Sequence, residues 1–409
     1  MEAPKAGAKQ HFQNASERFA FRVCQETFLS LWSYANPLNT SGKELCDVLV
    51  VCEPDIVVVS VKDYRINLEV SSELAADRWY KKAVEKSVKQ IYGAVRFIEK
   101  SGTRVLQCDG RQGLPLPTQD SRKIHRVSVS LGSAGHVLLQ SKDYGKGFVH
   151  VLDEKSFVLL MKHLDTITDF VGYLAEKERL AARIPGLEVD GEENLLAIYL
   201  HRGRTFPQDL PFDSIPNGLW DQFSSSDAFQ RKLQADDVSY LWDRLLEYFG
   251  HHAISGTLES ENDLAQDESV FREMAREGRF GRRVLGETLS SFFQRARAGE
   301  IRSRMTLSPR GVGYVFLNAQ PSDSRISRRT ELEMRCLVAR GELRCDTVVG
   351  VCVNLTAAPD GHCEDVLLLQ IPEWTPELAE RAAAIKAELG YFARPQAFTK
   401  HAEEFPSED

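Results

Sequence analysis

The strongest constraint on the fold is a pair of apolar runs near the amino terminus, residues 46–52 and 56–62, separated by Glu53-Pro54-Asp55. Continuous runs rich in valine are typical of strands that are buried on both faces of a sheet. The connection between them has the length of a turn, so the two runs are predicted to form an antiparallel β-hairpin. The elements expected around this hairpin favour an α/β or α+β domain.

The hairpin brings one acidic and one basic side chain together. A symmetric turn centred on Pro54-Asp55 places Asp47 opposite Lys62, and directly opposed residues have Cβ atoms about 5 Å apart. One interpretation is a structural ion pair at the end of the strands. The other is a metal site, in which Asp47 binds a divalent cation and Lys62 polarises or deprotonates the attacking water. Magnesium suits this site, because it accepts one or two carboxylates together with waters and substrate phosphates.

The spacing of apolar residues predicts further helices and strands along the chain. The helices are expected at 16–34, 72–99, 156–163, 165–180, 237–249, 282–297 and 376–389. The other strands are expected at 104–108, 124–131, 147–152, 313–317, 348–354 and 366–371. These elements divide the chain into five parts. They are a flexible tail (1–13), a first domain (14–180), an acidic linking region with a helix (181–268), an arginine-rich α+β domain (269–395) and a second tail (396–409).

The order of these features resembles the PD-(D/E)xK nuclease superfamily, also called restriction-endonuclease-like. The resemblance rests on a first helix with an acid, on Glu44-x-x-Asp47 entering an apolar strand, on a second strand that ends Ser60-Val61-Lys62, and on the long helix that follows. It implies a mixed sheet flanked by helices and a hydrolase that cleaves phosphodiester bonds, with DNA as the expected substrate. It also implies that Asp47 binds Mg²⁺ or Mn²⁺, that Lys62 is the catalytic lysine, and that Glu26, with Glu17 as its competitor, completes the metal site.

The sequence departs from the family pattern at Ser60, where an acid is expected two residues before the lysine. Glu44 is the first candidate to replace this carboxylate, because it lies just before Asp47. The weaker candidates lie on the following helix and are Glu73 and Glu85. That helix also carries Gln90, whose alternatives are a role in positioning the site and a solvated surface position. The departure leaves a second hypothesis open, a catalytically inactive module that binds protein or nucleic acid.

Two basic segments are candidates for binding nucleic acid. Lys82, Lys86 and Lys89 recur at helical spacing after the hairpin, so they share one helix face. Residues 272–344 contain sixteen arginines, no lysine and eight acids, and Arg302 and Arg304 are the expected contacts there. Arginine suits bidentate binding of phosphate. The alternative for this second segment is a set of ion pairs with the interleaved acids.

Composition narrows the remaining possibilities. The formal net charge is −8, so generic binding of nucleic acid by the whole surface is not expected. No apolar run approaches the roughly 18 residues of a membrane span. The first residues contain no apolar signal segment, and none of the eight cysteines forms a CxxC pair, which favours a reduced cytoplasmic protein. The family resemblance adds two candidate partners besides nucleic acid: a second copy of the chain, and a protein of a defence system.

Overall fold

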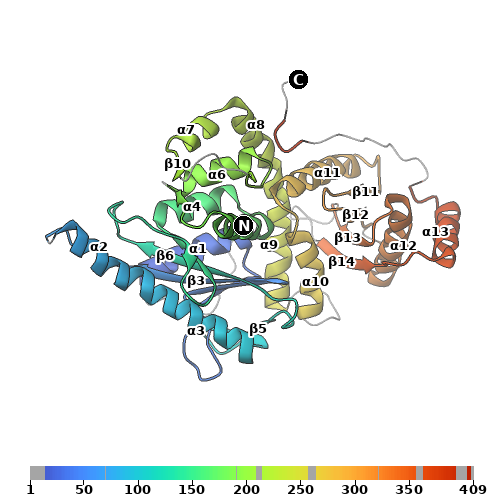
Figure 1. The fold of residues 1–409 in the computed structure, drawn as a ribbon. Coiled ribbons are helices and arrows are strands. Elements are labelled where there is room, and N and C mark those ends of the chain that lie inside the picture. The colour runs from blue at the N-terminus through green and yellow to red at the C-terminus, as the bar shows by residue number, and fades with distance from the viewer. Residues whose placement is uncertain are drawn as a thin grey trace. The chain divides into compact units, whose positions relative to one another are not determined.

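The computed structural model shows two compact units, residues 1–226 and 227–409 (Figure 1). Each unit combines helices with its own main sheet. The described residues are 14–69, 71–189, 191–208, 214–256, 264–320, 322–355, 363–392 and 403–406. The expected tail at 1–13 and most of the tail at 396–409 lie outside these ranges.

The first unit is built on a six-stranded mixed sheet with the strand order β1-β2-β3-β6-β8-β7. These strands are β1 (Ser33–Ala35), β2 (Val48–Cys52), β3 (Asp55–Asp63), β6 (Lys123–Leu131), β7 (Lys142–Asp143) and β8 (Phe148–Leu152). Strands β3, β6 and β8 run parallel, so their carboxyl ends lie at one edge of the sheet. Strand β2 is antiparallel to β3, which brings Asp47, the residue before β2, to the same edge.

The predicted hairpin of β2 and β3 is confirmed, but its predicted register is wrong by two residues. The turn consists of Glu53 and Pro54 alone. The observed pairing, when continued past the end of β2, places Asp47 opposite Ser60 and not opposite Lys62. Because side chains alternate between the two faces of a strand, a shift of two residues keeps them on the same face. Asp47 and Lys62 are therefore diagonal neighbours.

Helices cover both faces of this sheet. The helices of the first unit are α1 (Ala15–Phe28), α2 (Ser72–Tyr80), α3 (Lys86–Ser101), α4 (Glu154–His163), α5 (Ile167–Arg183), α6 (Glu192–His201) and α7 (Leu219–Ser224). A π-helical segment, Lys81–Glu85, joins α2 to α3. Helix α3 packs on β3 and β6, whereas α1 and α4 lie on the other side of the sheet (Figure 1). Two short ribbons complete the unit, β4 (Arg104–Leu106) with β5 (Gln112–Pro115), and β9 (Glu188–Val189) with β10 (Ser214–Ile215).

The first helix is shorter than predicted. It ends at Phe28, and Leu29 takes a positive φ of 68° that interrupts the helix. The end of the expected range, 16–34, instead includes most of β1, which pairs with the edge of β2. Trp32 and Tyr34 are buried there. Strand pairing thus satisfies the backbone of a segment whose apolar spacing also fits a helix.

The first unit also extends beyond the predicted boundary near 180. Glu192, at the start of α6, accepts hydrogen bonds from Tyr173 and Lys177 of α5 at 2.6–2.7 Å. Arg204 forms an ion pair with Asp169 of α5 at 3.0 Å. These polar contacts tie the described residues after 180 to α5, so part of the expected linking region belongs to the first unit.

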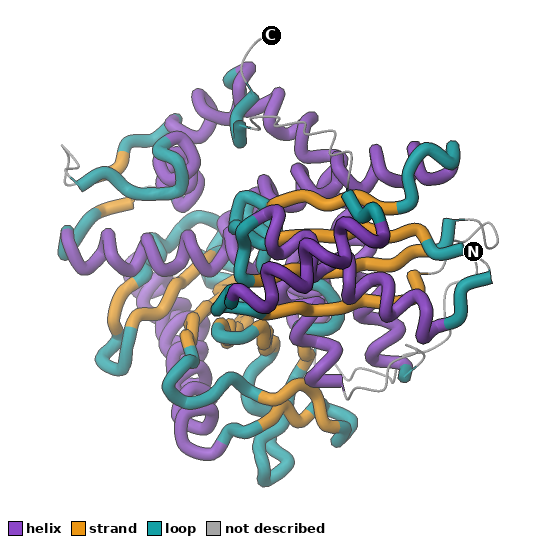
Figure 2. Tube along the Cα trace, turned by 90° about the vertical axis from the view of Figure 1, so that its right-hand side faces the viewer, coloured by secondary structure: helices purple, strands orange, loops and turns teal. Residues whose placement is uncertain are grey.

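The second unit contains a four-stranded sheet in the order β11-β12-β13-β14. Its strands are β11 (Ser303–Leu307), β12 (Gly313–Asn318), β13 (Thr347–Val353) and β14 (Cys363–Gln370), of which β12 and β13 are parallel. Its helices are α8 (Asp227–Asp236), α9 (Tyr240–Ser255), α10 (Leu264–Ala275), α11 (Arg279–Arg297), α12 (Arg325–Leu343) and α13 (Pro376–Leu389). Figure 2 shows helices lying across the strands of this sheet.

Four described elements of the second unit are missing from the sequence prediction, namely α8, α10, β11 and α12. Helix α12 carries many charged side chains, which obscure its buried stripe of Leu332, Cys336 and Ala339. Helix α13 has the predicted ends, and the predicted helix 72–99 consists of α2, the π-helical segment and α3. The other expected helices and strands of both units are confirmed with different ends. None of the described helices combines the length and the apolar character that a membrane span requires.

Candidate active site at the carboxyl end of β3

Asp47 is a buried carboxylate held by three donors. Its side chain is only 2 % exposed. Its Oδ2 accepts hydrogen bonds from the backbone N–H of Val61 at 2.5 Å and from Lys62 Nζ at 3.2 Å. Its Oδ1 accepts a hydrogen bond from Gln90 Nε2 at 3.2 Å. A buried charge is tolerated only when it is paired and hydrogen-bonded, and Asp47 meets this condition.

Lys62 connects this carboxylate to solvent. Its ammonium group contacts Asp47 and donates to the carbonyl of Val61 at 3.0 Å, and its side chain is 22 % exposed. The lysine is the second-to-last residue of β3, at the carboxyl end of that strand. An ammonium group at this end can donate to a water or to a phosphate oxygen from outside while it keeps its contact with the buried acid.

Gln90 reaches the site from α3 and holds two acids. Its Nε2 donates to Asp47 and also lies 3.5 Å from Oε1 of Glu44. Its Oε1 accepts a hydrogen bond from the Ser60 hydroxyl at 2.9 Å, and Ser60 is fully buried. Ser60 therefore contacts the amide of Gln90 at the position where the resemblance implies an acid.

The charge of the two carboxylates also acts on a neighbouring thiol. Burial raises the pKa of Cys46 well above its ordinary value. The negative charges of Asp47 and Glu44 raise this pKa further, and the positive charge of Lys62 opposes them. The Cys46 thiol is thus neutral and buried beside the cluster, where it acts as an apolar group.

The structure brings together five of the six predicted catalytic residues, namely Glu44, Asp47, Ser60, Lys62 and Gln90. It does not bring in the sixth, Glu26. The hydroxyl of Ser16 donates to Asp63 at 2.6 Å, which places the start of α1 at the end of β3. Glu26 lies ten residues further along α1, roughly 15 Å at 1.5 Å per residue, and it is exposed. The competitor Glu17 lies in the first turn and is buried.

The donor set fits a hard divalent cation with few protein ligands. Asp47 and Glu44 direct one carboxylate oxygen each to the same nitrogen atom of Gln90. Within the described residues, no group of three histidine, cysteine, aspartate or glutamate side chains is arranged to hold a metal ion. Two carboxylates are enough for Mg²⁺, which usually retains waters and binds substrate phosphates. The predicted third ligand, Glu26, is not part of this donor set.

Three exposed lysines lie on α3, the helix that supplies Gln90, and on the π-helical segment before it. Lys82, Lys86 and Lys89 are all exposed. On the inner side of the same helix, Ser87 and Gln90 contact β3. The three lysines are thus displayed on the element that borders the acid cluster, as a phosphate-binding surface requires.

The structure favours the ion-pair interpretation of the arginine-rich segment. Arg302 binds Asp323 at 2.9 Å and Glu331 at 2.6 Å, and this hydrogen bond to Glu331 raises its pKa. Arg304 is half-buried and donates to the Ser291 hydroxyl at 2.9 Å. The expected exposed basic face at Arg302 and Arg304 is therefore not formed. Other arginines of the segment with acidic partners are Arg272, Arg279, Arg282, Arg283, Arg295, Arg310, Arg328, Arg329, Arg335 and Arg340.

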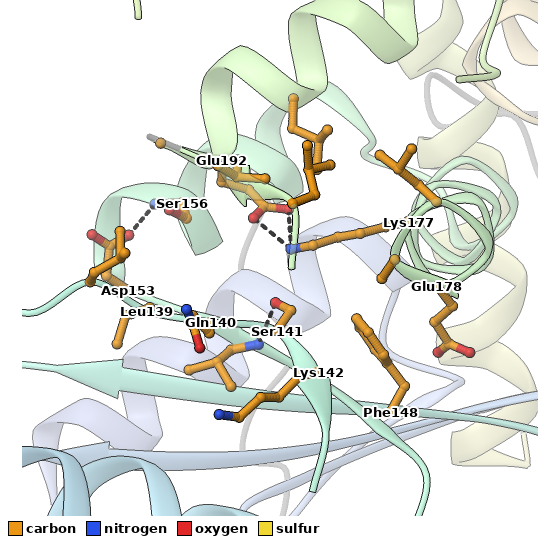
Figure 3. A pocket seen from close by; sticks show the side chains of 18 of the residues that line it. Leu139, Gln140, Ser141, Lys142, Phe148, Asp153, Ser156, Lys177, Glu178 and Glu192 are labelled. Carbon is orange, nitrogen blue, oxygen red and sulfur yellow. Dashed lines mark hydrogen bonds and ion pairs between the residues drawn. The ribbon is translucent and has the colours of Figure 1, made fainter. Parts of the chain in front are cut away.

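Sequence reasoning missed a second charged site in the first unit. A cavity of about 940 Å³ is lined by the segment after β6, by the end of α5 and by the start of α6. Figure 3 shows Lys177 extending to the carboxylate of Glu192 beside this cavity. Both side chains are less than 10 % exposed. The residues lie fifteen positions apart on different helices, so no sequence motif joins them.

Two titratable groups near this ion pair are held neutral. Burial, followed by the charge of Glu192, raises the pKa of Tyr173 well above its ordinary value. Burial lowers the pKa of His150 to about 4, against the opposing effect of its hydrogen bond to Glu178, and the charge of Lys177 lowers it further. The buried ion pair therefore has uncharged neighbours, whereas the cavity wall carries further charged side chains, among them Lys142, Asp153 and Glu178.

Comparison with known proteins adds nothing to this picture. No family model matches the chain, and no match is found among curated proteins or solved structures.

Proposed function

We propose that this protein is a metal-dependent nuclease that hydrolyses phosphodiester bonds, with DNA as the expected substrate and Mg²⁺ or Mn²⁺ as the cofactor. One observation carries the proposal: Glu44, Asp47, Lys62 and Gln90 converge at the carboxyl end of β3, with the lysine partly open to solvent. The resemblance to the PD-(D/E)xK pattern supports the same assignment.

The residues divide the work of hydrolysis among them. Asp47 and Glu44 would hold the cation, which when bound supplies Lewis-acid stabilisation of the phosphoryl oxygens. Lys62 orients the attacking water with its N–H donors and stabilises the negative charge that develops on the phosphate. Lys82, Lys86 and Lys89 bind the phosphates that flank the cleaved bond. The water oxygen forms a bond to phosphorus, the bond to the leaving oxygen breaks, and the protons exchange with solvent.

The test is incubation of the purified full chain with plasmid, linear and single-stranded DNA, and with RNA, in the presence of Mg²⁺, Mn²⁺ or EDTA. We expect cleavage that requires the metal and stops with EDTA. The cation held by the two carboxylates stabilises the negative charge on the phosphate, and EDTA removes this cation. Activity that is unchanged by EDTA would reject a metal-dependent mechanism. No cleavage of any substrate at any metal concentration would favour the second function below.

The second candidate is a catalytically inactive binding module. The observation that favours it is that Asp47 already receives three donors, while Ser60 stands where the family pattern has an acid. In this case nucleic acid would bind to Lys82, Lys86 and Lys89 without being cleaved. Binding without cleavage, unchanged by Mn²⁺, would distinguish this module from the enzyme.

A further inference from the structure

Two carboxylates of the acid cluster converge on one nitrogen atom. Gln90 Nε2 lies 3.2 Å from Asp47 Oδ1 and 3.5 Å from Glu44 Oε1. A divalent cation that is shared by two carboxylates takes a place of this kind, between one oxygen of each. The primary amide has two N–H donors, so it can serve both acceptors at once. The amide nitrogen thus lies where a shared cation would bind.

The orientation of this amide is fixed by Ser60. The Ser60 hydroxyl donates to Gln90 Oε1 at 2.9 Å, so the nitrogen is directed to the carboxylates. Ser60 is fully buried on β3. The hydroxyl of Ser87, one turn before Gln90, donates to the Ser60 carbonyl at 3.2 Å and fastens α3 to the strand. The amide is therefore held in place from both the strand and the helix.

We propose that the amide of Gln90 occupies the cation position and that the cation must displace it, so that Gln90 and Ser60 together set the cation affinity. This inference rests on the proposed function. Gln90 is a positioning residue that keeps two like charges together before the metal arrives, since two carboxylates without a donor between them repel each other. In this proposal the role of Ser60 is to orient the amide of Gln90.

The inference predicts that removal of the amide tightens metal binding. Gln90→Met keeps the length of the side chain and removes both its donors and its acceptor. We expect this variant to bind Mn²⁺ about tenfold more tightly than the wild-type chain, because the cation no longer competes with charge-assisted hydrogen bonds. Ser60→Ala frees the amide to rotate, and we expect roughly a threefold gain, since one neutral hydrogen bond is lost.

The experiment is titration of the full chain with MnCl₂ in the absence of nucleic acid, followed by calorimetry and by the electron paramagnetic resonance signal of free Mn²⁺. The matched control is Gln112→Met, the same substitution at an exposed glutamine of β5, in a different sheet from β2 and β3. It should bind Mn²⁺ like the wild type. Circular dichroism confirms folding, and Gln90→Ala replaces Gln90→Met if the thioether disturbs packing.

The outcomes separate this inference from the proposed function. Tighter Mn²⁺ binding by Gln90→Met, with unchanged binding by Gln112→Met, supports the displacement of the amide. Weaker or equal binding by Gln90→Met overturns it and leaves the metal site at Asp47 standing. If the wild type and all variants fail to bind millimolar Mn²⁺, the inference falls together with the metal-dependent function.

Discussion

Two lysine–carboxylate pairs of the first unit, Lys177 with Glu192 and Lys62 with Asp47, differ in geometry. Lys177 contacts both oxygens of Glu192 at 2.6–2.7 Å, and both residues are almost completely buried. Lys62 contacts a single oxygen of Asp47 at 3.2 Å and is about a fifth exposed. The first pair joins α5 to α6, whereas the second lies at the edge of the sheet among further donors. A closed, bidentate pair is suited to holding helices together, and a longer pair with access to solvent is suited to exchanging its partners.

The two pairs also differ in what surrounds them. Tyr173 adds a third donor to Glu192, and the nearby groups Tyr173 and His150 are held neutral. Around Asp47, the neighbours include a second carboxylate, Glu44, and the amide that both acids share. Negative charge is thus matched at the first site, while it is concentrated at the second. Concentrated carboxylates bordered by a lysine favour a cation, and a matched pair does not.

The largest expected effect separates the pairs by activity. We expect Lys62→Ala to reduce DNA cleavage about 10²–10⁴-fold, as the loss of a positioned proton-transfer or charge-stabilising group does. Folding and nucleic-acid binding should remain nearly unchanged, because Lys62 acts on the attacking water. Initial cleavage rates and a binding isotherm measure the two properties separately.

The matched control for this variant is Lys123→Ala. Lys123 is exposed and lies at the amino-terminal end of β6, where it is opposite Asp55 of β3 in the strand register. It should cleave like the wild type. Equal rates for the Lys62 and Lys123 variants would remove the distinction between the pairs and with it the catalytic assignment.

The second prediction concerns stability. Lys177→Met leaves the carboxylate of Glu192 buried without its cation, so we expect the free energy of unfolding to fall by about 3 kcal/mol. Guanidinium unfolding monitored by circular dichroism measures this loss. The exposed pair of Lys155 with Glu193 gives the control, and Lys155→Met should change the stability by less than about 0.5 kcal/mol. A loss below 1 kcal/mol for Lys177→Met would show that its ion pair does not hold the helices together.

The third and smallest effect concerns salt. Lys82, Lys86 and Lys89 are proposed to bind the phosphates beside Lys62. Their joint replacement by glutamine should lower the magnitude of the slope of log affinity against log salt concentration for duplex DNA by roughly two to three units. Arg302 and Arg304, which are engaged within the second unit, should leave this slope unchanged when replaced together by glutamine. Fluorescence anisotropy at several salt concentrations measures both slopes. The reverse result would move the nucleic-acid surface to the second unit.

The sequence predicted which residues meet in the acid cluster better than it predicted their geometry. Asp47 and Lys62 were expected to meet because a short connection between two apolar runs leaves few alternatives to a hairpin. The predicted register was wrong because the segment Glu53-Pro54-Asp55 fits a turn centred on Pro54-Asp55 as well as it fits the observed turn of Glu53 and Pro54. Glu44 and Gln90 were named as candidates, but their contact through one amide depends on how α3 packs on β3, which no local pattern specifies.

The failures share a cause, the dependence of a charged side chain on tertiary partners. Glu26 fits a metal-binding helix by its position in the sequence, yet it lies ten residues along α1 from Ser16, the residue that contacts the end of β3. The sequence predicts that Arg302 contacts phosphate, whereas in the structure it forms ion pairs with Asp323 and Glu331. The pair of Lys177 and Glu192 joins two helices whose packing could not be predicted. In each case the composition is visible in the sequence, but the partner is not.

The placement of the cluster along the chain has a consequence for its assembly during synthesis. All five of its residues lie between Glu44 and Gln90, and its two strands are joined by a turn of two residues. Loop-closure entropy grows with the length of the enclosed segment, so the contact of Asp47 with Lys62 requires little ordering of the chain. Chains fold from the amino-terminal domain while they are made. The acids, the lysine and the amide therefore leave the ribosome before β6 and β8. These later strands add to the β3 side of a hairpin whose charged residues are already synthesised.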